Sequence, residues 1–350
     1  MKRFLLVLVC LLCSLFTFAT SYRVLFIGNS YTEVNNLPQL VTDIAQSTGD
    51  EITFMSHTPG GCTFQQHLAG AMSYIREGGW DYVVLQEQSQ LPSFPENQFM
   101  SQCYPYAKQL CDSIRRYNPE AEIVFYMTWG RKNGDAQNCP YFPPLCTYEG
   151  MDSLLHARYM IMAADNQALV SPVGHVWHYI RDHHPEIELY QADESHPSLA
   201  GSYAAACSFY ATFFAKDPTG IQYDANLPDE TARIIRETAS RLVFDSLSSW
   251  SFLPLDDDTV GISLIYDEAD MFVSPNPASY QVVVSFGELY NENTELYLYN
   301  QGGQLVRRTS TTDEFKVVMP LYDLPDGIYF LQARQPHRYY KIQKIVKVSQ

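Results

Sequence analysis

The sequence predicts two domains of different class: an α/β domain with a doubly wound parallel sheet, followed by a small all-β sandwich. Three observations lead to this prediction. From residue 22 to about residue 245, short apolar strands alternate with amphipathic helices, as in a parallel sheet covered by helices on both faces. The segment 249–270 then interrupts the pattern with a proline and three consecutive aspartates. From residue 271 onward, the period changes to the two-residue alternation of β-strands.

The elements of the first domain follow one another in a regular order. Strands are expected at residues 22–28, 51–56, 82–86, 122–129 and 168–173. Helices are expected at residues 37–47, 64–77, 99–117, 148–165, 198–215 and 229–245. The strands are short and apolar and helices connect them, so we expect them to run parallel. The first domain is therefore assigned to residues 20–248, with a linker at 249–270.

The second domain is assigned to residues 271–350. Its strands alternate in hydrophobicity: YQVVVSF, TELYLYNQGGQLVRR, FKVVMPL, GIYFLQAR and YYKIQKIVKV. Gly-Gly and Pro-Asp-Gly turns accompany these runs, which is typical of antiparallel hairpins in a small sandwich. Charge divides at the same place, since residues 20–271 carry 32 acidic and 13 basic side chains and residues 272–350 carry 7 and 8.

Residues 1–19 are expected to be a cleavable signal peptide. A Lys2-Arg3 start precedes an unbroken apolar stretch and a small-residue ending at Ala19, the usual order of such a segment. A lipoprotein anchor at Cys10 or Cys13 is disfavoured, because a large apolar residue precedes each of them. No later stretch approaches the roughly 20 apolar residues of a membrane-spanning helix. The mature chain is expected to begin near Thr20 and to leave the cytoplasm.

The net charge limits the possible partners. The formal charge of -16 becomes -18 once Lys2 and Arg3 are removed, an acidity that disfavours nucleic acid and anionic membranes. Six of the eight cysteines enter an oxidising compartment. Cys139 and Cys146 lie in a Pro-rich loop and are suited to form a disulfide. Cys103 and Cys111 lie on one predicted helix about 12 Å apart, which is beyond the reach of a disulfide. Cys62 and Cys207 are expected to be buried thiols.

A serine follows the first predicted strand in the stretch VLFIGNSYT, residues 24–32. The hydroxyl of Ser30 is a weak nucleophile, and it needs a base, an orienting partner for that base and donors for an oxyanion. The stretch DESHPS supplies His196 as the base and Asp193, three residues before it, as the orienting carboxylate. Carboxyl ends of parallel strands converge at one sheet edge. We therefore expect these three side chains to meet there.

Candidate oxyanion donors follow the second and third strands. Gly61, with Gly60 as an alternate, lies in TPGGCTF, and a Gly-rich turn presents its N–H groups outward. A glutamine in VVLQEQSQ supplies a side-chain amide, either Gln86 or Gln88. With the Ser30 N–H, these groups are predicted to form a three-donor oxyanion hole.

These four motifs in this order resemble the SGNH (GDSL-type) hydrolase superfamily over roughly residues 22–215. The residues within the motifs are most similar to those of a secreted Bacteroidetes branch of this superfamily. The resemblance implies a flavodoxin-like sheet and ester hydrolysis without a cofactor. Asn29 stands where the superfamily usually has Asp before the serine. The third block lacks the usual Gly-x-Asn, and the branch pattern Leu-Gln-x-x-Ser favours Gln86 over Gln88.

The C-terminal part resembles the sorting domain of type IX secretion cargo, through VSPNPAS, LPDGIYF and the terminal KIQKIVKV. This resemblance implies the secretion machinery as a partner, export across the outer membrane, and a secreted or cell-surface location. It implies nothing about the reaction.

Aromatic and histidine residues give two weaker indications. Asn29, Trp129 and Trp177 are candidates for the substrate pocket, although buried aromatic residues at strand ends and helix faces are as often core. The run HVWHYIRDHH places four histidines on one predicted helix, but no carboxylate or cysteine set with fitting spacing accompanies them, so no metal site is expected.

The sequence thus predicts a secreted serine esterase that hydrolyses acyl esters, most plausibly O-acetyl esters of carbohydrates. Two alternatives stay open. One is a lipase, arylesterase or acyltransferase that uses the same residues. The other is a surface glycan-binding protein whose hydrolase site is vestigial.

Overall fold

The computed structural model describes residues 19–253, 271–286, 294–311, 316–335, 338–339 and 343–348. The chain divides into two compact units, Met1–Leu253 and Pro254–Gln350, and each is treated by itself. The predicted signal peptide, apart from Ala19, and the greater part of the predicted linker 249–270 lie outside the described residues.

The first unit is built on a five-stranded parallel sheet, as the sequence predicted. Its strands lie in the order β2-β1-β3-β4-β5: β1 Ser21–Ile27, β2 Glu51–His57, β3 Tyr82–Leu85, β4 Glu122–Tyr126 and β5 Leu169–Ser171. Ile27, the last residue of β1, pairs with His57 on one side and with Leu85 on the other. This order is that of flavodoxin-like sheets, in which ligands bind where the strand order reverses, between β1 and β3.

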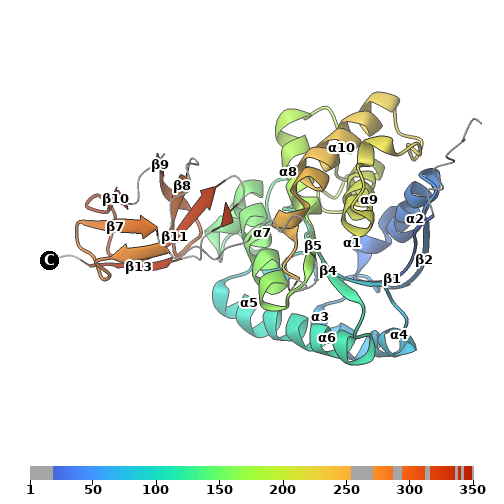
Figure 1. Ribbon diagram of the computed structural model, residues 1–350, viewed down its shortest axis with the longest axis horizontal. Coiled ribbons are helices and arrows are strands. Elements are labelled where there is room, and N and C mark those ends of the chain that lie inside the picture. The colour runs from blue at the N-terminus through green and yellow to red at the C-terminus, as the bar shows by residue number, and fades with distance from the viewer. Residues whose placement is uncertain are drawn as a thin grey trace, which may run out of the picture. The chain divides into compact units, whose positions relative to one another are not determined.

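Helices cover both faces of the sheet (Figure 1). On one side lie α2 Leu37–Ser47, α9 Leu199–Phe214 and α10 Asp229–Leu242, and on the other lie α3 Phe64–Gly70, α4 Met72–Glu77 and α6 Tyr104–Tyr117. The remaining helices are α1 Ser30–Glu33, α5 Glu96–Gln102, α7 Tyr148–Asp165 and α8 Val173–His183.

Two predicted helices are each divided in the structure. The segment 64–77 forms α3 and α4, which meet at Ala71. The segment 99–117 begins earlier, at Glu96, and changes direction at Cys103, where α5 ends and α6 begins. Pro105 lies in the first turn of α6, where a missing N–H is tolerated. In the interior of one longer helix it would remove a hydrogen bond, so a new helix starts there.

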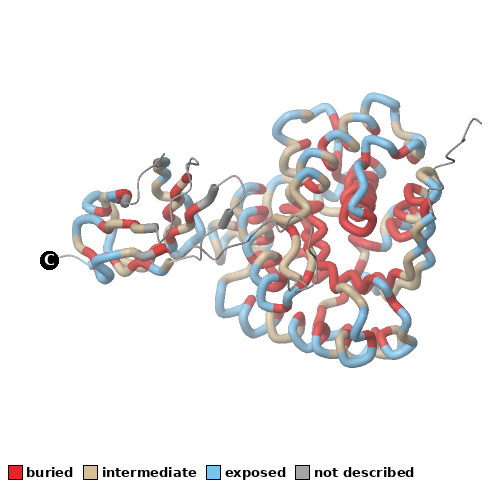
Figure 2. The backbone as a smooth tube through the Cα atoms, in the orientation of Figure 1, coloured by how far each residue is buried: buried red, intermediate tan, exposed pale blue. Residues whose placement is uncertain are grey.

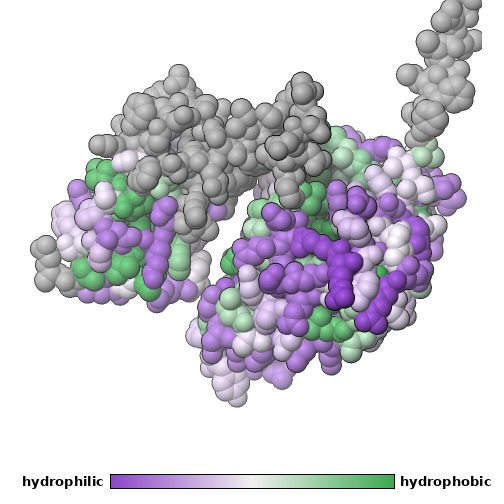
Figure 3. Space-filling model, turned by 60° about the horizontal axis from the view of Figure 1, so that its bottom comes forward, coloured by the Kyte–Doolittle hydropathy of each residue, from purple (hydrophilic) through white to green (hydrophobic). Residues whose placement is uncertain are grey.

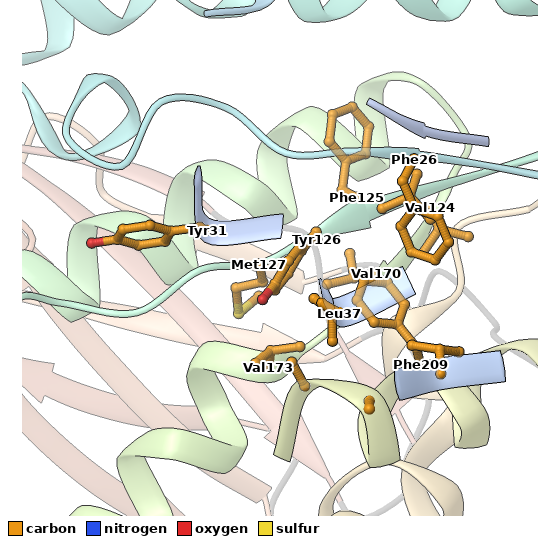
Figure 4. Close-up of a cluster of buried hydrophobic side chains, with 14 of the residues drawn as sticks. Phe26, Tyr31, Leu37, Val124, Phe125, Tyr126, Met127, Val170, Val173 and Phe209 are labelled. Atoms are coloured by element: carbon orange, nitrogen blue, oxygen red, sulfur yellow. The ribbon is translucent and has the colours of Figure 1, made fainter. Parts of the chain in front are cut away.

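Buried residues gather around the sheet of this unit (Figure 2), and most of them are apolar. Phe26, Val124 and Phe209 are fully buried and meet in the cluster drawn in Figure 4. Every residue of α9 from Ala200 to Phe214 is buried. Burial of one large apolar side chain stabilises the fold by about 1.5–3 kcal/mol. A helix enclosed in this way is held rigidly, and it begins three residues after His196.

The second unit is all-β, again as predicted. Its strands form two antiparallel sheets, β10-β7-β6 and β12-β11-β8-β9 with β13 beside β11. The strands are β6 Met271–Ser274, β7 Gln281–Phe286, β8 Thr294–Asn300, β9 Leu305–Thr311, β10 Lys316–Pro320, β11 Gly327–Gln335, β12 Arg338–Tyr339 and β13 Gln343–Lys347. Val284 from one sheet and Leu298 and Leu331 from the other share one buried core. The sheets therefore pack face to face.

The described cysteines of the first unit fall into two groups. Cys139 and Cys146 form a disulfide, as anticipated from their loop. Cys62, Cys103, Cys111 and Cys207 are free and buried. Hydrophilic residues cover much of the face of this unit that Figure 3 shows. Over the residues that the structure describes, no helix is both long and apolar enough to span a bilayer.

Candidate active site

Ser30 lies at the carboxyl edge of β1, in a turn that is closely packed. The preceding Gly28 has no room for a side chain, since a Cβ there would lie 2.5 Å from Thr32 Oγ1 and 2.7 Å from Gln86 Oε1. Asn29 caps α1, because its side-chain oxygen accepts a hydrogen bond from the Tyr31 N–H at 3.1 Å. Its amide nitrogen donates to the Cys62 carbonyl at 3.1 Å. The serine is therefore presented by a fixed backbone.

His196 and Asp193 lie beside this serine, as the sequence predicted for their positions. The Nε2 atom of His196 is 2.8 Å from Ser30 Oγ, and Nδ1 is 2.5 Å from Asp193 Oδ2. The other carboxylate oxygen of Asp193 accepts from the N–H groups of Ser195 and His196 at 3.1 and 3.0 Å. The three side chains thus form one continuous hydrogen-bonded row.

The hydrogen bonds also settle the charge of Asp193. Burial alone would raise its pKa, but the His196 ring and the two backbone N–H donors outweigh burial and hold the pKa below its ordinary value. An ionised carboxylate favours the proton on Nδ1 of the neighbouring imidazole. The lone pair of Nε2 then faces the hydroxyl of Ser30, which is the arrangement that a general base requires.

A cavity of about 240 Å³ opens at this row. Nine residues line it: Asn29, Ser30, Tyr31, Gly61, Gln88, Ser89, Arg131, Ser195 and His196. Five of them had been named as candidates from the sequence. The sequence did not predict the other four, which are Tyr31, Ser89, Arg131 and Ser195. Tyr31 and Ser195 could have been inferred, because each is adjacent in sequence to a predicted catalytic residue.

The structure separates the two glutamines considered for the oxyanion hole. Gln86 is fully buried, and its Oε1 accepts from the Asn29 N–H and the Thr32 hydroxyl, both at 2.9 Å. Its Nε2 donates to the Glu87 carbonyl. Gln86, the favoured residue, therefore lies beneath the serine turn and does not line the cavity. Gln88 does line it, with Nε2 within 3.0 Å of Gln90 Oε1.

Of the two glycines in the turn after β2, Gly61 lies at the cavity and Gly60, the alternate candidate, does not. Gly61 lines the cavity and has φ +66°, a conformation that side chains other than glycine rarely adopt. Gly60 is exposed and is not among the lining residues. The turn is closed by the Cys62 N–H, which donates to the Pro59 carbonyl at 3.0 Å, and Thr63 then caps α3.

The two tryptophans proposed for the substrate pocket do not reach it. Trp129 and Trp177 are fully buried and stack on each other with ring centroids 3.7 Å apart. Trp129 also stacks on Tyr31 at 4.8 Å, and its Nε1 donates to the Ser195 carbonyl at 3.1 Å. These rings lie behind the cavity wall and support it. In Figure 4, the Tyr31 hydroxyl points away from the other labelled apolar side chains.

A buried carboxyl group, Glu87, connects the two donor turns. One of its oxygens accepts from the N–H of Phe64, at the start of α3, at 2.9 Å, and from the N–H of Gln88 at 2.6 Å. Burial raises its pKa to about 8, despite these two donors. Sequence reasoning did not single it out, although a glutamate two residues after an apolar strand was a visible signal.

The histidine-rich helix α8 takes no part in this site. His178 contacts Asp152 at 2.8 Å and Asp182 at 3.3 Å, and these carboxylates raise its pKa above the ordinary value. Trp177 packs inward from the same helix. Within the described ranges, no group of three or more His, Cys, Asp or Glu side chains is arranged to hold a metal ion.

The comparison with protein families concerns the second unit. Residues 273–348 match the family model described as a secretion system C-terminal sorting domain. This match confirms the predicted sorting domain and indicates that the protein is a secretion cargo. No curated protein matches the sequence.

Several solved structures resemble the chain in fold. A DUF4886 family protein from Bacteroides uniformis has a TM-score of 0.52 and 16% identity, over 63% of this chain and 94% of its own. A protein from Slackia heliotrinireducens, described as belonging to the SGNH hydrolases, has a TM-score of 0.45 and 27% identity, over 55% and 99%. An acetyl xylan esterase from Geobacillus stearothermophilus has a TM-score of 0.39 and 16% identity, over 55% and 94%. The first of these likenesses shows that the two proteins share a fold.

Proposed function

We propose that the first unit is a serine ester hydrolase in which Ser30 is the nucleophile, His196 the general base and Asp193 the residue that orients His196. The observation that carries this proposal is the row of hydrogen bonds from Ser30 through His196 to Asp193, at 2.8 and 2.5 Å. A hydroxyl that faces one imidazole nitrogen, while a carboxylate holds the other, is activated for attack on a carbonyl.

The reaction follows from this geometry. His196 Nε2 takes the hydroxyl proton as Ser30 Oγ bonds to the ester carbonyl carbon, and the carbonyl oxygen becomes an oxyanion. The N–H groups of Ser30 and Gly61 and the amide of Gln88 hold this oxyanion. The alcohol leaves with the proton from His196, and the acyl group stays on Ser30. Water, deprotonated by the same imidazole, then attacks the acyl-enzyme and releases the acid.

The proposed substrate is an O-acetyl or similarly short acyl ester of a carbohydrate. A cavity of about 240 Å³ accommodates a small acyl group. Apart from Tyr31 and Gly61, its lining side chains are hydroxyls, amides, an imidazole and a guanidinium, which suit a polar substrate better than a long acyl chain. The sorting domain indicates secretion, and an extracellular location supports a glycan as the substrate.

A fluorophosphonate probe tests the proposed nucleophile without any assumption about the substrate. We expect one adduct on Ser30 of the full chain, and its loss in Ser30→Ala and in His196→Ala. Ser113→Ala, at a serine of α6 that does not line the cavity, is the matched control and should label normally. A folded protein that does not label would favour the glycan-binding alternative.

Acetate release from a panel of acetylated glycans tests the proposed substrate. Turnover by the unaltered protein that is absent in Ser30→Ala supports a carbohydrate esterase. Labelling of Ser30 together with preferred hydrolysis of long-chain or aryl esters would instead support a lipase or arylesterase. Transfer of the acyl group to an added sugar in preference to water would identify an acyltransferase.

A further inference from the structure

Arg131 gives the cavity a fixed positive charge beside the proposed nucleophile. It follows β4 in the chain and lines the cavity together with Ser30 and His196. Among the nine described lining residues, Arg131 is the only Lys, Arg, Asp or Glu side chain. A quarter of its side chain, 26%, remains exposed.

The guanidinium is held in place by a buried carboxylate. Its Nη1 donates to Asp135 Oδ1 at 3.1 Å, and the side chain of Asp135 is fully buried. Gln90 and Asn138 donate to the other oxygen of Asp135 at 2.6 and 2.7 Å. Burial alone would raise the pKa of Asp135, but these donors and the guanidinium outweigh it and lower the pKa. Asp135 is therefore ionised at neutral pH and fixes the position of Arg131.

The backbone around Arg131 is also fixed. The Tyr190 hydroxyl donates to the Gly130 carbonyl at 2.7 Å, and the Lys132 N–H donates to the Glu194 carbonyl at 2.9 Å. The second bond ties this segment to the loop that carries Asp193 and His196. The guanidinium thus stands at a set place relative to the proposed catalytic row.

The donors of Arg131 are only partly used. A guanidinium carries five N–H groups on two edges, and Asp135 engages Nη1. The Nε–H is buried and has no hydrogen-bond partner among the described residues. A charged group that lines a cavity and is partly exposed favours a ligand that supplies negatively charged oxygen atoms.

The reaction alone does not account for this cation. The oxyanion of the proposed mechanism has its own donors, and a neutral ester carries no charge for Arg131 to neutralise. The first domain is strongly acidic, with 32 acidic and 13 basic side chains over residues 20–271, so its overall field does not attract anions. A cation in this cavity therefore acts locally, on whatever lies next to Ser30.

We propose that Arg131 binds a carboxylate of the substrate, so that the preferred esters are anionic ones. This inference rests on the proposed function, because it assigns the substrate class of the same site. The carboxylate belongs either to the acyl part, as in a dicarboxylic half-ester, or to the alcohol part, as in an acetylated acidic sugar. Both present the same group to the guanidinium.

Two pairs of matched esters distinguish these sources. On the acyl side, 4-nitrophenyl hemiglutarate is compared with its methyl ester, and on the alcohol side, 3-(carboxymethyl)phenyl acetate is compared with its methyl ester. Within each pair, the scissile bond is the same and only the distant charge differs. We expect the unaltered protein to prefer the carboxylate in one pair by about tenfold in kcat/KM, which corresponds to one charged hydrogen-bonded contact.

Variants at Arg131 show whether this residue causes the preference. Arg131→Gln should abolish the ratio within the preferred pair, mainly through KM, and Arg131→Lys should keep part of it because the charge remains. Lys132→Gln is the matched control, since Lys132 is the neighbouring cation and pairs with Glu188 outside the cavity lining. It should leave the ratio unchanged. Thermal melting of each variant shows that it is folded.

Failure of this inference can be told apart from failure of the proposed function. Hydrolysis of both neutral esters with no preference for either carboxylate would overturn the inference and leave the esterase intact. Binding of glutarate monomethyl ester and 3-hydroxyphenylacetate to Ser30→Ala, measured by calorimetry, provides a readout without turnover. Binding of neither compound, or equal binding after Arg131→Gln is added, would overturn the inference even if no ester were hydrolysed.

Discussion

Two walls of the same cavity are held by different physical means. The wall with His196 is continuous with the core, since Ser198 caps the buried helix α9 and the stacked ring of Trp129 donates to the Ser195 carbonyl. The wall with Arg131 belongs to the segment 131–147, which is held by the buried carboxylate of Asp135 and, further along the chain, by the Cys139–Cys146 disulfide. The first wall carries the proposed chemistry and the second the proposed selectivity. The core thus fixes the reacting groups, while a stapled loop supplies the contact that distinguishes substrates.

The largest effect is expected on the first wall, from Asp193→Asn. The substitution keeps the shape of the side chain but removes the charge that favours a proton on His196 Nδ1. In serine hydrolases of this design, the corresponding change lowers kcat by roughly 10⁴-fold, and we expect a loss of this order in acetate release.

Asp112→Asn provides the control for this prediction. Asp112 is an exposed aspartate that pairs with Lys108 on α6, away from the cavity, and its replacement should leave kcat unchanged. A loss of less than tenfold in Asp193→Asn would contradict the orienting role of Asp193.

Much of the first wall could be predicted from the sequence, because its residues lie in short motifs that directly follow strands or precede a helix. Asp193 and His196 lie three residues apart, and Ser30 follows a strand whose apolar pattern was plain, so the order of motifs sufficed to place them at one edge. The choice between Gln86 and Gln88 was different. It depends on which side chain packs under the serine loop. In an extended segment, positions two residues apart point to the same side, so the sequence pattern does not distinguish them.

The second wall could not be predicted in the same way. Arg131 reaches the cavity because Asp135, Gln90 and Asn138 fold around one buried carboxylate, and no periodic pattern marks such a loop. Trp129 and Trp177 show the opposite case: their type suggested a binding surface, but both are fully buried and stack on each other. Residue type predicted the role of a side chain well next to regular strands and helices. It predicted the role poorly where long-range packing determines whether the side chain is buried.

The buried carboxyl group that connects the turns after β2 and β3 is tested by Glu87→Gln. The raised pKa of Glu87, about 8, means that the folded protein keeps a proton that the unfolded chain loses near pH 4.5. Stability should therefore fall as the pH rises from about 4.5 to 8, by an amount on the order of a few kcal/mol in the free energy of unfolding. Glu87→Gln keeps an oxygen for the N–H groups of Phe64 and Gln88 but cannot ionise.

Urea unfolding at a series of pH values measures this difference. Across the same range, the variant should show a clearly flatter decline in the free energy of unfolding than the unaltered protein. Glu120→Gln, at an exposed position, is the control and should keep the original slope. Identical pH profiles for the unaltered protein and Glu87→Gln would show that Glu87 is not a neutral buried acid.

A smaller effect is expected from opening the staple of the second wall with Cys139→Ser and Cys146→Ser together. The lost disulfide closes a short loop and should lower the free energy of unfolding by about 2 kcal/mol. The row of Ser30, His196 and Asp193 does not include this loop. We therefore expect fluorophosphonate labelling at a nearly unchanged rate, together with a reduced preference for the carboxylate esters. If the labelling rate and the preference for carboxylate esters fell by the same factor, the two walls would not be independent.

The smallest effect should come from Tyr31→Phe, which probes where the two walls meet. The Tyr31 hydroxyl is 2.7 Å from Ser195 Oγ, and burial raises its pKa, so it stays a neutral hydroxyl at ordinary pH. Its ring remains stacked on Trp129 in the variant, so only one hydrogen bond is lost. Such a bond contributes about 1 kcal/mol, which predicts roughly a fivefold fall in kcat/KM for neutral and anionic esters alike. A fall confined to the anionic esters would show that Tyr31 acts on the carboxylate with Arg131 and belongs to the second wall.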